Sequence, residues 1–211
     1  MNKKIKKILD KKNKSKIVCL TAYSKSIASI LDKFVDIILV GDSMANVLYG
    51  HKNTHKISLK NILQHTSSVK MGVNNSLLVV DMPKGSYQNI KIAHKNVKLI
   101  ISKTKCDAIK LESNGKNYKI IESLVKKKIP VMGHIGYTPQ FKKNFKIEGT
   151  SKLDCLKLLK EAKAIEKAGA FSIVLECISP WTAKLITKEL YIPTIGIGSS
   201  SYCDGQILVT A

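Results

Sequence analysis

A short apolar run with strand-like composition, followed by a segment with helical periodicity, recurs along the whole chain. The runs lack a clean alternation of apolar and polar residues, so we expect both faces of each strand to be covered. Eight such runs are present, at residues 16–22, 36–41, 76–82, 107–113, 130–136, 171–177, 193–199 and 205–210. Eight strands alternating with helices predict an α/β fold, a (β/α)8 barrel of the TIM type.

The predicted barrel takes up the chain as one domain, residues 1–211, with residues 1–15 as a basic N-terminal helical segment. A chain of 211 residues suffices for one large domain or two small ones. No low-complexity linker divides it. The sequence stops at Ala211, just after the eighth run, where a complete barrel would place one more helix. We therefore expect a barrel that lacks the final helix.

The basic residues give the chain a formal net charge of +21, and all 36 of them are lysine. Arginine is the residue that holds phosphate and guanine with two parallel hydrogen bonds, and the sequence contains none. The lysines are also spread along the chain rather than clustered. We therefore expect solvated lysine-rich faces and no nucleic-acid partner.

Neither a membrane span nor a secretory leader is expected. No apolar run approaches the ~20 residues that a spanning helix needs. The N-terminal segment has no hydrophobic signal core and no small-residue cleavage pattern. The five cysteines show no C-x-x-C spacing, which favours reduced thiols that serve in packing. We expect a cytoplasmic protein without a membrane partner.

Acidic side chains stand at or near the ends of four of the predicted strands: Asp42, Asp81, Glu112 and Glu176. In a (β/α)8 barrel the carboxyl ends of the strands meet at one rim, which carries the active site. Asp42, Asp81 and Glu112 would repel one another there unless a cation neutralised them. Oxygen donors without a zinc-like Cys or His spacing favour Mg²⁺. The alternative for each acid alone is a role in solvent or at a helix cap.

Three further residues are candidates for chemistry. Lys110 lies two residues before Glu112, so both side chains share one face of the strand, which is either the barrel interior beside the metal or the outside. Glu176 ends an apolar run, and an apolar setting generally suits a carboxylate to general-base work near neutral pH. His134 is flanked by glycines and is either a core residue or a ligand-binding one.

Ordered motifs along the chain match a known family. They are LTAYS (20–24), ILVGDSM (38–44), HTSSV (65–69), LLVVDMPKGSYQ (77–88), IKLES (109–113), IPVMGHIGYTPQ (129–140), AGAFSIVLEC (168–177) and IPTIGIGSSSYCDGQILV (192–209). Over residues 16–209 the sequence resembles the ketopantoate hydroxymethyltransferase family. The ordered set is far more specific than any one motif in it.

The resemblance implies a (β/α)8 barrel enzyme of pantothenate biosynthesis that uses Mg²⁺. Its reaction is transfer of a hydroxymethyl group from 5,10-methylenetetrahydrofolate to 3-methyl-2-oxobutanoate, giving 2-dehydropantoate, and its members are homo-oligomers. The matching motifs imply the metal ligands Asp42, Asp81 and Glu112, the keto-acid set Asp42, Ser43, Asp81 and Lys110, and the proton acceptor Glu176. We add His134 to the keto-acid set as a candidate.

Two alternatives remain open from the sequence. The first is a Mg²⁺-dependent 2-oxo-acid C–C lyase of the phosphoenolpyruvate mutase and isocitrate lyase type, although the chain has no Lys-Cys-Gly-His-like signature. The second is a decayed barrel that acts as a basic binding protein. The joint presence of the acids, Ser43 and Lys110 argues against decay.

Overall fold

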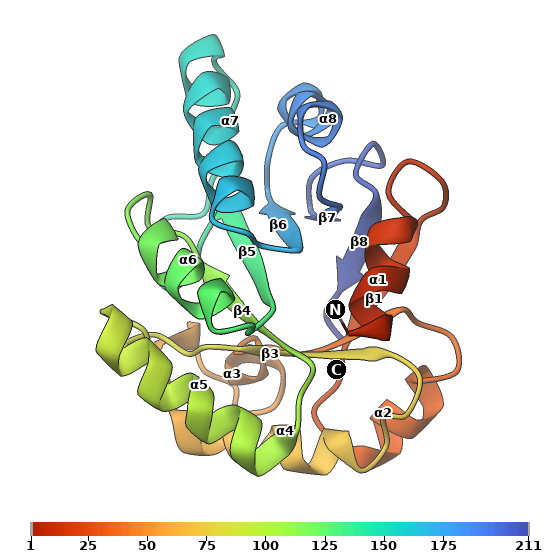
Figure 1. Cartoon of the computed structure of the whole chain (residues 1–211). Helices are drawn as coiled ribbons and strands as arrows, with labels where there is room; N and C mark the ends of the chain where they lie inside the picture. Colours follow the sequence, from red (N-terminus) through yellow and green to blue (C-terminus); the bar gives the residue numbers. More distant parts are fainter. Residues whose placement is uncertain (1, 211) are drawn as a thin grey trace.

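A closed ring of eight parallel strands forms the centre of the computed structural model, which describes residues 2–210 (Figure 1). Neighbours in the chain are neighbours in the ring, and β1 pairs with β8 to close it. The strands are β1 (Ile17–Thr21), β2 (Ile37–Val40), β3 (Leu77–Asp81), β4 (Ala108–Glu112), β5 (Val131–Gly136), β6 (Ser172–Glu176), β7 (Thr194–Ile197) and β8 (Gly205–Leu208). The predicted (β/α)8 barrel is confirmed.

Helices cover most of the outside of this ring. They are α2 (Lys25–Leu31), α4 (Leu59–Lys70), α5 (Ile90–Thr104), α6 (Tyr118–Lys126), α7 (Lys152–Lys167) and α8 (Pro180–Glu189). The expected alternation fails between β7 and β8, where residues 198–204 form only turns and bends. Gly198 there has φ +56°, a left-handed conformation that turns the chain at once toward the next strand. Strand β8 is the last helix or strand of the described residues.

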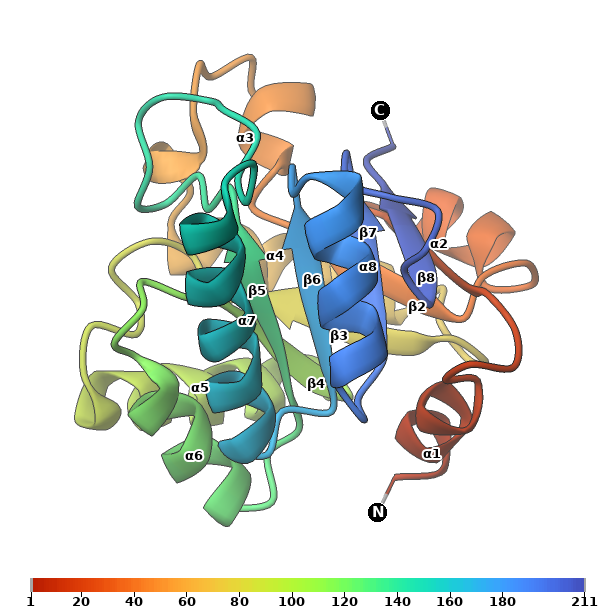
Figure 2. The ribbon, with the colours of Figure 1, turned by 90° about the horizontal axis from the view of Figure 1, so that it is seen from above.

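Two apolar layers hold the barrel together. One lies between the sheet and the helices, and the other fills the barrel interior. The interior layer also contains Ile5 and Ile8 from helix α1 (Lys3–Asp10), which lies at the end of the barrel away from the strand tips (Figure 2). Burying each of these side chains contributes roughly 1.5–3 kcal/mol. Helix α1 falls inside the basic segment expected at residues 1–15, while the division of the chain into domains stays a prediction.

The outer faces of β1 and β8 are only partly covered. Val18 is 44% exposed and Leu208 is 65% exposed. All five cysteines are buried and without a disulfide partner among residues 2–210. No helix in this part of the chain combines the length and the apolar character needed to cross a membrane.

The carboxyl ends of the strands carry the longer connections. Short helices α3 (Met44–Val47) and η1 (Thr54–Lys56) follow β2, and a long loop, residues 137–151, follows β5. Figure 2 shows both connections at the same end of the barrel. They are joined there by a hydrogen bond between His55 Nε2 and the Pro139 carbonyl oxygen, 3.0 Å apart. These loops form the outer walls of a cavity at this end of the barrel.

Candidate functional site

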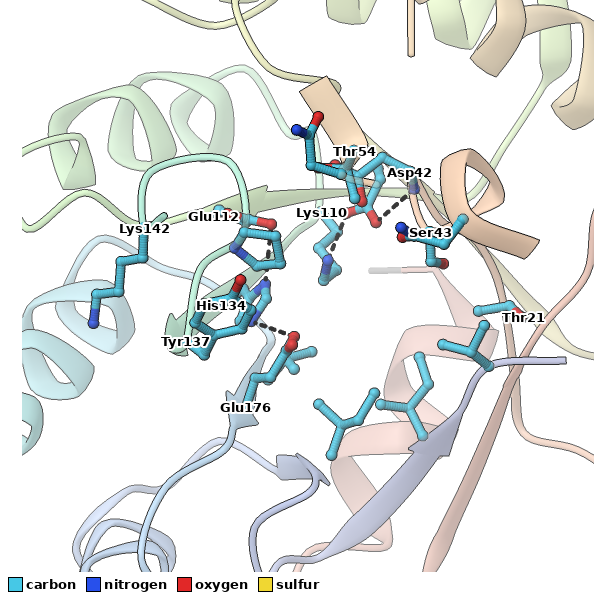
Figure 3. Close-up of a pocket in the computed structure, with 18 of the residues that line it drawn as sticks. Thr21, Asp42, Ser43, Thr54, Lys110, Glu112, His134, Tyr137, Lys142 and Glu176 are labelled. Atoms are coloured by element: carbon cyan, nitrogen blue, oxygen red, sulfur yellow. Dashed lines mark hydrogen bonds and ion pairs between the residues drawn. The ribbon is translucent and has the colours of Figure 1, made fainter. Parts of the chain in front are cut away.

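A cavity of about 670 Å³ opens at the carboxyl ends of the strands (Figure 3). The barrel geometry brings every site residue expected from the sequence to this one cavity. They are Asp42, Ser43, Asp81, Lys110, Glu112, His134 and Glu176. Their roles stay predictions, but their convergence from strands β2 to β6 follows directly from the parallel ring.

Strand register places the inner polar side chains in adjacent pairs. Asp81 at the end of β3 is the register partner of Lys110 in β4. Glu112 at the end of β4 is in turn the partner of His134 in β5. Register partners on neighbouring strands project to the same side of the sheet. The side chain of Lys110 therefore points into the barrel mouth, which decides between the two orientations open from the sequence.

Lys110 and Asp81 form a buried ion pair. Lys110 Nζ donates a hydrogen bond of 2.7 Å to Asp81 Oδ1, and both side chains are under 10% exposed. Burial alone would lower the pKa of Lys110, but the carboxylates around it, with Asp81 first, raise this pKa above its ordinary value. The lysine therefore stays charged and can face a substrate oxyanion.

The carboxyls of Asp42 and Glu112 are less well neutralised. Burial, and then the charge of Asp81, raise the pKa of Asp42 to about 7. Burial, and then the charge of Asp42, raise the pKa of Glu112 well above its ordinary value. One lysine among three buried carboxyls leaves excess negative charge at this end of the cavity.

Gln140 connects these two acids and was not recognised from the sequence. Its Nε2 donates to Asp42 Oδ2 at 2.9 Å, and its backbone N–H donates to Glu112 Oε2 at 3.0 Å. The side-chain oxygen of Gln140 accepts from the hydroxyl of Tyr87 at 2.6 Å. The signals in the sequence were its place in the matched motif IPVMGHIGYTPQ (129–140) and its place shortly after a strand, where barrel loops carry functional residues.

His134 lies between two carboxylates in the floor of the cavity. Its Nε2 is 3.2 Å from Glu176 Oε2, and its Nδ1 is 3.9 Å from Glu112 Oε1. Neither nitrogen has a hydrogen-bond partner of good geometry among the described residues, although the ring is 1% exposed. Burial, and then the charge of Lys110, lower the pKa of His134, so the ring is neutral at pH 7. A neutral ring in contact with Glu176 can orient that carboxylate.

An apolar wall faces the acids across the cavity, and it too was missed from the sequence. It comes mainly from strands β2, β6, β7 and β8, through Leu39, Val174, Ile197, Ile207 and the following Val209. Glu176 stands where this wall meets the polar half (Figure 3). The cavity can therefore hold a molecule with a charged end and a branched hydrocarbon end.

The oxygen donors present fit a divalent cation. Buried carboxyls with raised pKa values are those that a nearby positive charge would return to the ionised form. Within residues 2–210, no three His, Cys, Asp or Glu side chains converge closely enough to hold one ion. Mg²⁺ is commonly held by only one or two carboxylates together with water and substrate oxygens. Asp42 and Asp81 fit the role of direct ligands, and Glu112 fits a role through water.

Without metal, the protein is expected to become more stable as the pH falls from 8 to 6. The folded pKa of Asp42 is raised, so the folded protein keeps a proton that the unfolded chain releases, and the gain is at most about 1.4 kcal/mol per pH unit for one proton. Asp42→Asn removes this contribution and should flatten the dependence. Urea unfolding of parent and variant in EDTA, at pH 8 and at pH 6, measures the change in the free energy of unfolding. An equal pH dependence of stability in parent and variant would contradict the assignment of this effect to Asp42.

A phenol fixes the hydroxyl of Ser43. Tyr23 OH lies 2.9 Å from Ser43 Oγ, and burial raises the pKa of Tyr23, so the phenol stays protonated. If Ser43 belongs to the keto-acid set that the resemblance implies, Tyr23→Phe should raise the KM for 3-methyl-2-oxobutanoate about 3- to 10-fold, the worth of one hydrogen bond. Tyr118→Phe is the control, because Tyr118 is exposed at the start of α6 and does not line the cavity. Similar KM values for the parent and Tyr23→Phe would refute the role of Tyr23 in orienting Ser43.

Comparisons with known proteins give matches that extend over nearly the whole chain. The sequence profile of ketopantoate hydroxymethyltransferase matches residues 2–211. The 3-methyl-2-oxobutanoate hydroxymethyltransferase of Pelagibacter ubique (strain HTCC1062) is 55% identical over 210 residues, which cover 100% of this chain and 82% of that protein. The same enzyme of Thermosipho africanus (strain TCF52B) is 47% identical, with 97% of this chain and 79% of that protein covered.

A solved structure with the same fold is that of 2,3-dimethylmalate lyase, a member of the phosphoenolpyruvate mutase and isocitrate lyase superfamily. It has a TM-score of 0.71 and 14% identity, and the match covers 99% of this chain and 81% of that one. So low an identity shows the shared barrel and nothing about the reaction. The sequence profile and the high identities, in contrast, place this chain in the ketopantoate hydroxymethyltransferase family.

Proposed function

We propose that this protein transfers a hydroxymethyl group from 5,10-methylenetetrahydrofolate to 3-methyl-2-oxobutanoate, with uptake of water, to give 2-dehydropantoate and tetrahydrofolate. The observation that carries the proposal is the two-sided cavity. Asp42, Asp81 and Lys110 line its polar half, branched side chains line the other half, and Glu176 stands between them. A 2-oxo acid with an isopropyl group has the matching two ends.

The polar half would hold the carboxylate and keto oxygens of the substrate. Lys110 stays charged in its pair with Asp81 and offers positive charge to an oxygen that becomes negative during reaction. Ser43, oriented by Tyr23, would donate a hydrogen bond to the same group. Gly41 leaves room for this arrangement, since a Cβ at that position would lie 2.8 Å from Ser43 Oγ.

Glu176 would remove the proton from C3 of the keto acid. Its carboxylate reaches the cavity next to the apolar wall, where the isopropyl group would lie. His134 contacts the same carboxylate and, being neutral, leaves it free to accept a proton. Water opens the methylene bridge of the folate, both C–N bonds break to release tetrahydrofolate, and the methylene carbon is delivered at the oxidation level of formaldehyde. The nucleophilic C3 adds to this carbonyl carbon, and the new alkoxide takes up the proton that Glu176 removed and becomes the hydroxyl group. Apolar side chains on this side keep water from reprotonating C3 first.

Mg²⁺, when bound, supplies a Lewis acid that withdraws charge from the keto group and makes the C3 proton easier to remove. Asp42 and Asp81 would hold it, with Glu112 acting through water.

The test is turnover of 3-methyl-2-oxobutanoate with Mg²⁺, with and without the folate. Formation of 2-dehydropantoate only when the folate is present supports the proposal. Folate-independent cleavage of a 2-oxo acid would favour the lyase alternative. Salt-sensitive binding to DNA without turnover would favour a basic binding protein.

We also propose that the protein is a homo-oligomer. The support is the exposed apolar surface on the outer faces of β1 and β8, which includes Val18 and Leu208. Apolar surface of this kind is commonly covered by another subunit. Light scattering at micromolar concentration measures the mass of the particle in solution. A monomer under those conditions would refute the proposed homo-oligomer.

A further inference from the structure

One of the matched motifs, HTSSV (65–69), contributes no residue to the cavity. The motif lies in helix α4, which contacts α2 on the outside of the barrel. His65 and Ser68 are three residues apart in this helix and therefore share one face of it. His65 Nδ1 lies 2.7 Å from the carbonyl oxygen of Tyr23, and Ser68 Oγ accepts from the backbone N–H of Lys25 at 3.1 Å. Helix α4 thus holds the connection between β1 and α2 at two points.

The other ring nitrogen of His65 reaches the connection that follows β2. Its Nε2 lies 2.9 Å from the hydroxyl of Tyr49, and the two rings meet edge to face with their centroids 6.0 Å apart. Tyr49 lies just beyond α3, the short helix that begins directly after Ser43, and its backbone N–H donates to the Met44 carbonyl oxygen at 3.2 Å. One imidazole therefore joins the two strand connections that carry Tyr23 and Ser43.

These contacts form a closed circuit. From Ser43 the chain runs through α3 to Tyr49, and hydrogen bonds lead from Tyr49 to His65, from His65 to Tyr23, and from the phenol of Tyr23 back to Ser43 Oγ. No member can move without stretching a hydrogen bond of its neighbour. Packing does not replace these bonds, because a cavity of about 160 Å³ adjoins them, lined in part by Tyr23, Leu48 and His65. The position of Tyr23 therefore depends on the imidazole.

The partners of His65 also decide where the proton of its neutral ring lies. A carbonyl oxygen can only accept, so Nδ1 carries the proton and donates to Tyr23. Nε2 is then an acceptor for the hydroxyl of Tyr49. When the phenol of Tyr23 donates to Ser43 Oγ, the O–H of Ser43 is free to donate to a ligand in the main cavity, which Ser43 lines.

We propose that His65 is a positioning residue for the keto-acid site, because it holds the backbone of Tyr23 where the phenol reaches Ser43. This inference rests on the proposed function, in which Ser43 donates a hydrogen bond to the 2-oxo acid. His65 does not line the main cavity, so its loss acts through Tyr23 and Ser43. A hydrogen bond made equally to the bound substrate and to the transition state changes KM and leaves kcat nearly unchanged.

Two amide substitutions separate the two contacts of the imidazole. Asparagine places an amide nitrogen where histidine has Nδ1, and glutamine places its amide group where histidine has Nε2. His65→Asn keeps a donor for the Tyr23 carbonyl, so the KM for 3-methyl-2-oxobutanoate should stay within 2-fold of the parent value. His65→Gln loses this donor and should raise that KM about 3- to 10-fold, with kcat changed less than 2-fold.

The same two substitutions at His94 are the matched control. His94 lies in helix α5 and its Nε2 is 2.8 Å from Ser123 Oγ of α6, so it too joins two neighbouring elements, but it does not line the main cavity. His94→Asn and His94→Gln should both leave the KM within 2-fold of the parent value. An equal rise of KM in His65→Asn and His65→Gln would overturn the contact with Tyr23 as the source of the effect.

A double-mutant cycle tests the route from His65 to Ser43. Once Tyr23→Phe has removed the phenol hydroxyl, His65→Gln should raise the KM by less than a further 2-fold. Effects of the two substitutions that multiply in the double variant would show that His65 acts independently of the Tyr23 hydroxyl, and would overturn the proposal. Urea unfolding of each variant confirms that the folded protein is assayed.

The proton on His65 provides a readout that needs neither a variant nor turnover. Two-bond ¹H–¹⁵N NMR of the parent protein at pH 8 should show the neutral ring protonated on Nδ1. A ring protonated on Nε2 leaves no donor for the Tyr23 carbonyl, and in an active protein this result would overturn the positioning role alone. A parent protein with the proton on Nδ1 that shows neither exchange of the C3 proton of 3-methyl-2-oxobutanoate nor turnover would instead overturn the proposed function.

Discussion

Glu176→Gln is expected to bind Mg²⁺ and 3-methyl-2-oxobutanoate nearly as the parent does, while turnover falls by roughly 10²–10⁴-fold, the usual worth of a positioned base. The amide keeps the shape of the side chain but cannot accept a proton. The side chain lies in the cavity 3.2 Å from His134 and outside the Lys110–Asp81 pair, so the change should leave the polar half intact. Deuterium exchange at C3 without folate, followed by NMR, isolates the proton-transfer step.

The neighbouring imidazole gives this experiment its control. His134→Gln should slow the exchange less than Glu176→Gln, because the ring would act on the base by orienting it. Should Glu176→Gln exchange deuterium as fast as the parent, the base lies elsewhere and His134 becomes the next candidate. Its pKa, lowered by burial, leaves a ring nitrogen able to accept a proton at pH 7.

Asp81→Ala is expected to abolish metal-dependent binding of the keto acid and also to destabilise the fold. The change removes a proposed metal ligand and leaves the buried ammonium of Lys110 without its partner at 2.7 Å. Breaking one side of a buried ion pair typically costs about 3–5 kcal/mol. Calorimetric titration with the keto acid measures the first effect, and urea unfolding measures the second.

The double variant Asp81→Ala, Lys110→Met separates the two effects. Replacing both members of a buried pair with apolar groups is often nearly neutral for stability. The double variant should therefore recover much of the lost stability and still fail to bind the keto acid. Full binding by Asp81→Ala in the presence of EDTA would refute the metal assignment.

The fold was predictable because the strand runs are covered on both faces and recur around the ring. The acids at the strand ends were predictable for the same reason, since a barrel brings all its strand tips to one rim. The orientation of the Lys110 side chain was not predictable, because the sequence of a single strand does not show which of its faces lies inside the barrel. The register of Asp81 against Lys110 decides it, and that register belongs to the assembled sheet.

The contacts of Gln140 and Tyr23 could not be predicted from the sequence either. Gln140 meets Asp42 across 98 positions of the chain, and the phenol of Tyr23 meets Ser43 from a different strand connection. Neither residue type signals such a role by itself. The apolar wall was hidden for another reason: Val174 and Ile207 look the same in sequence whether they fill a core or line a cavity.

Ring closure between β1 and β8 bears on how the protein is made. Residues 17–20 have their partners at 205–208, and Thr210 hydrogen-bonds to Thr21 across nearly the whole chain. A nascent chain that still lacks β8 already contains all four acids, but the wall residues Ile207 and Val209 are missing and β1 has an open edge. Such an intermediate has the acids proposed to bind the metal but lacks part of the apolar wall proposed to shelter C3 of the keto acid. Catalytic competence should therefore arise in a single late event, when β8 pairs with β1, rather than grow with chain length.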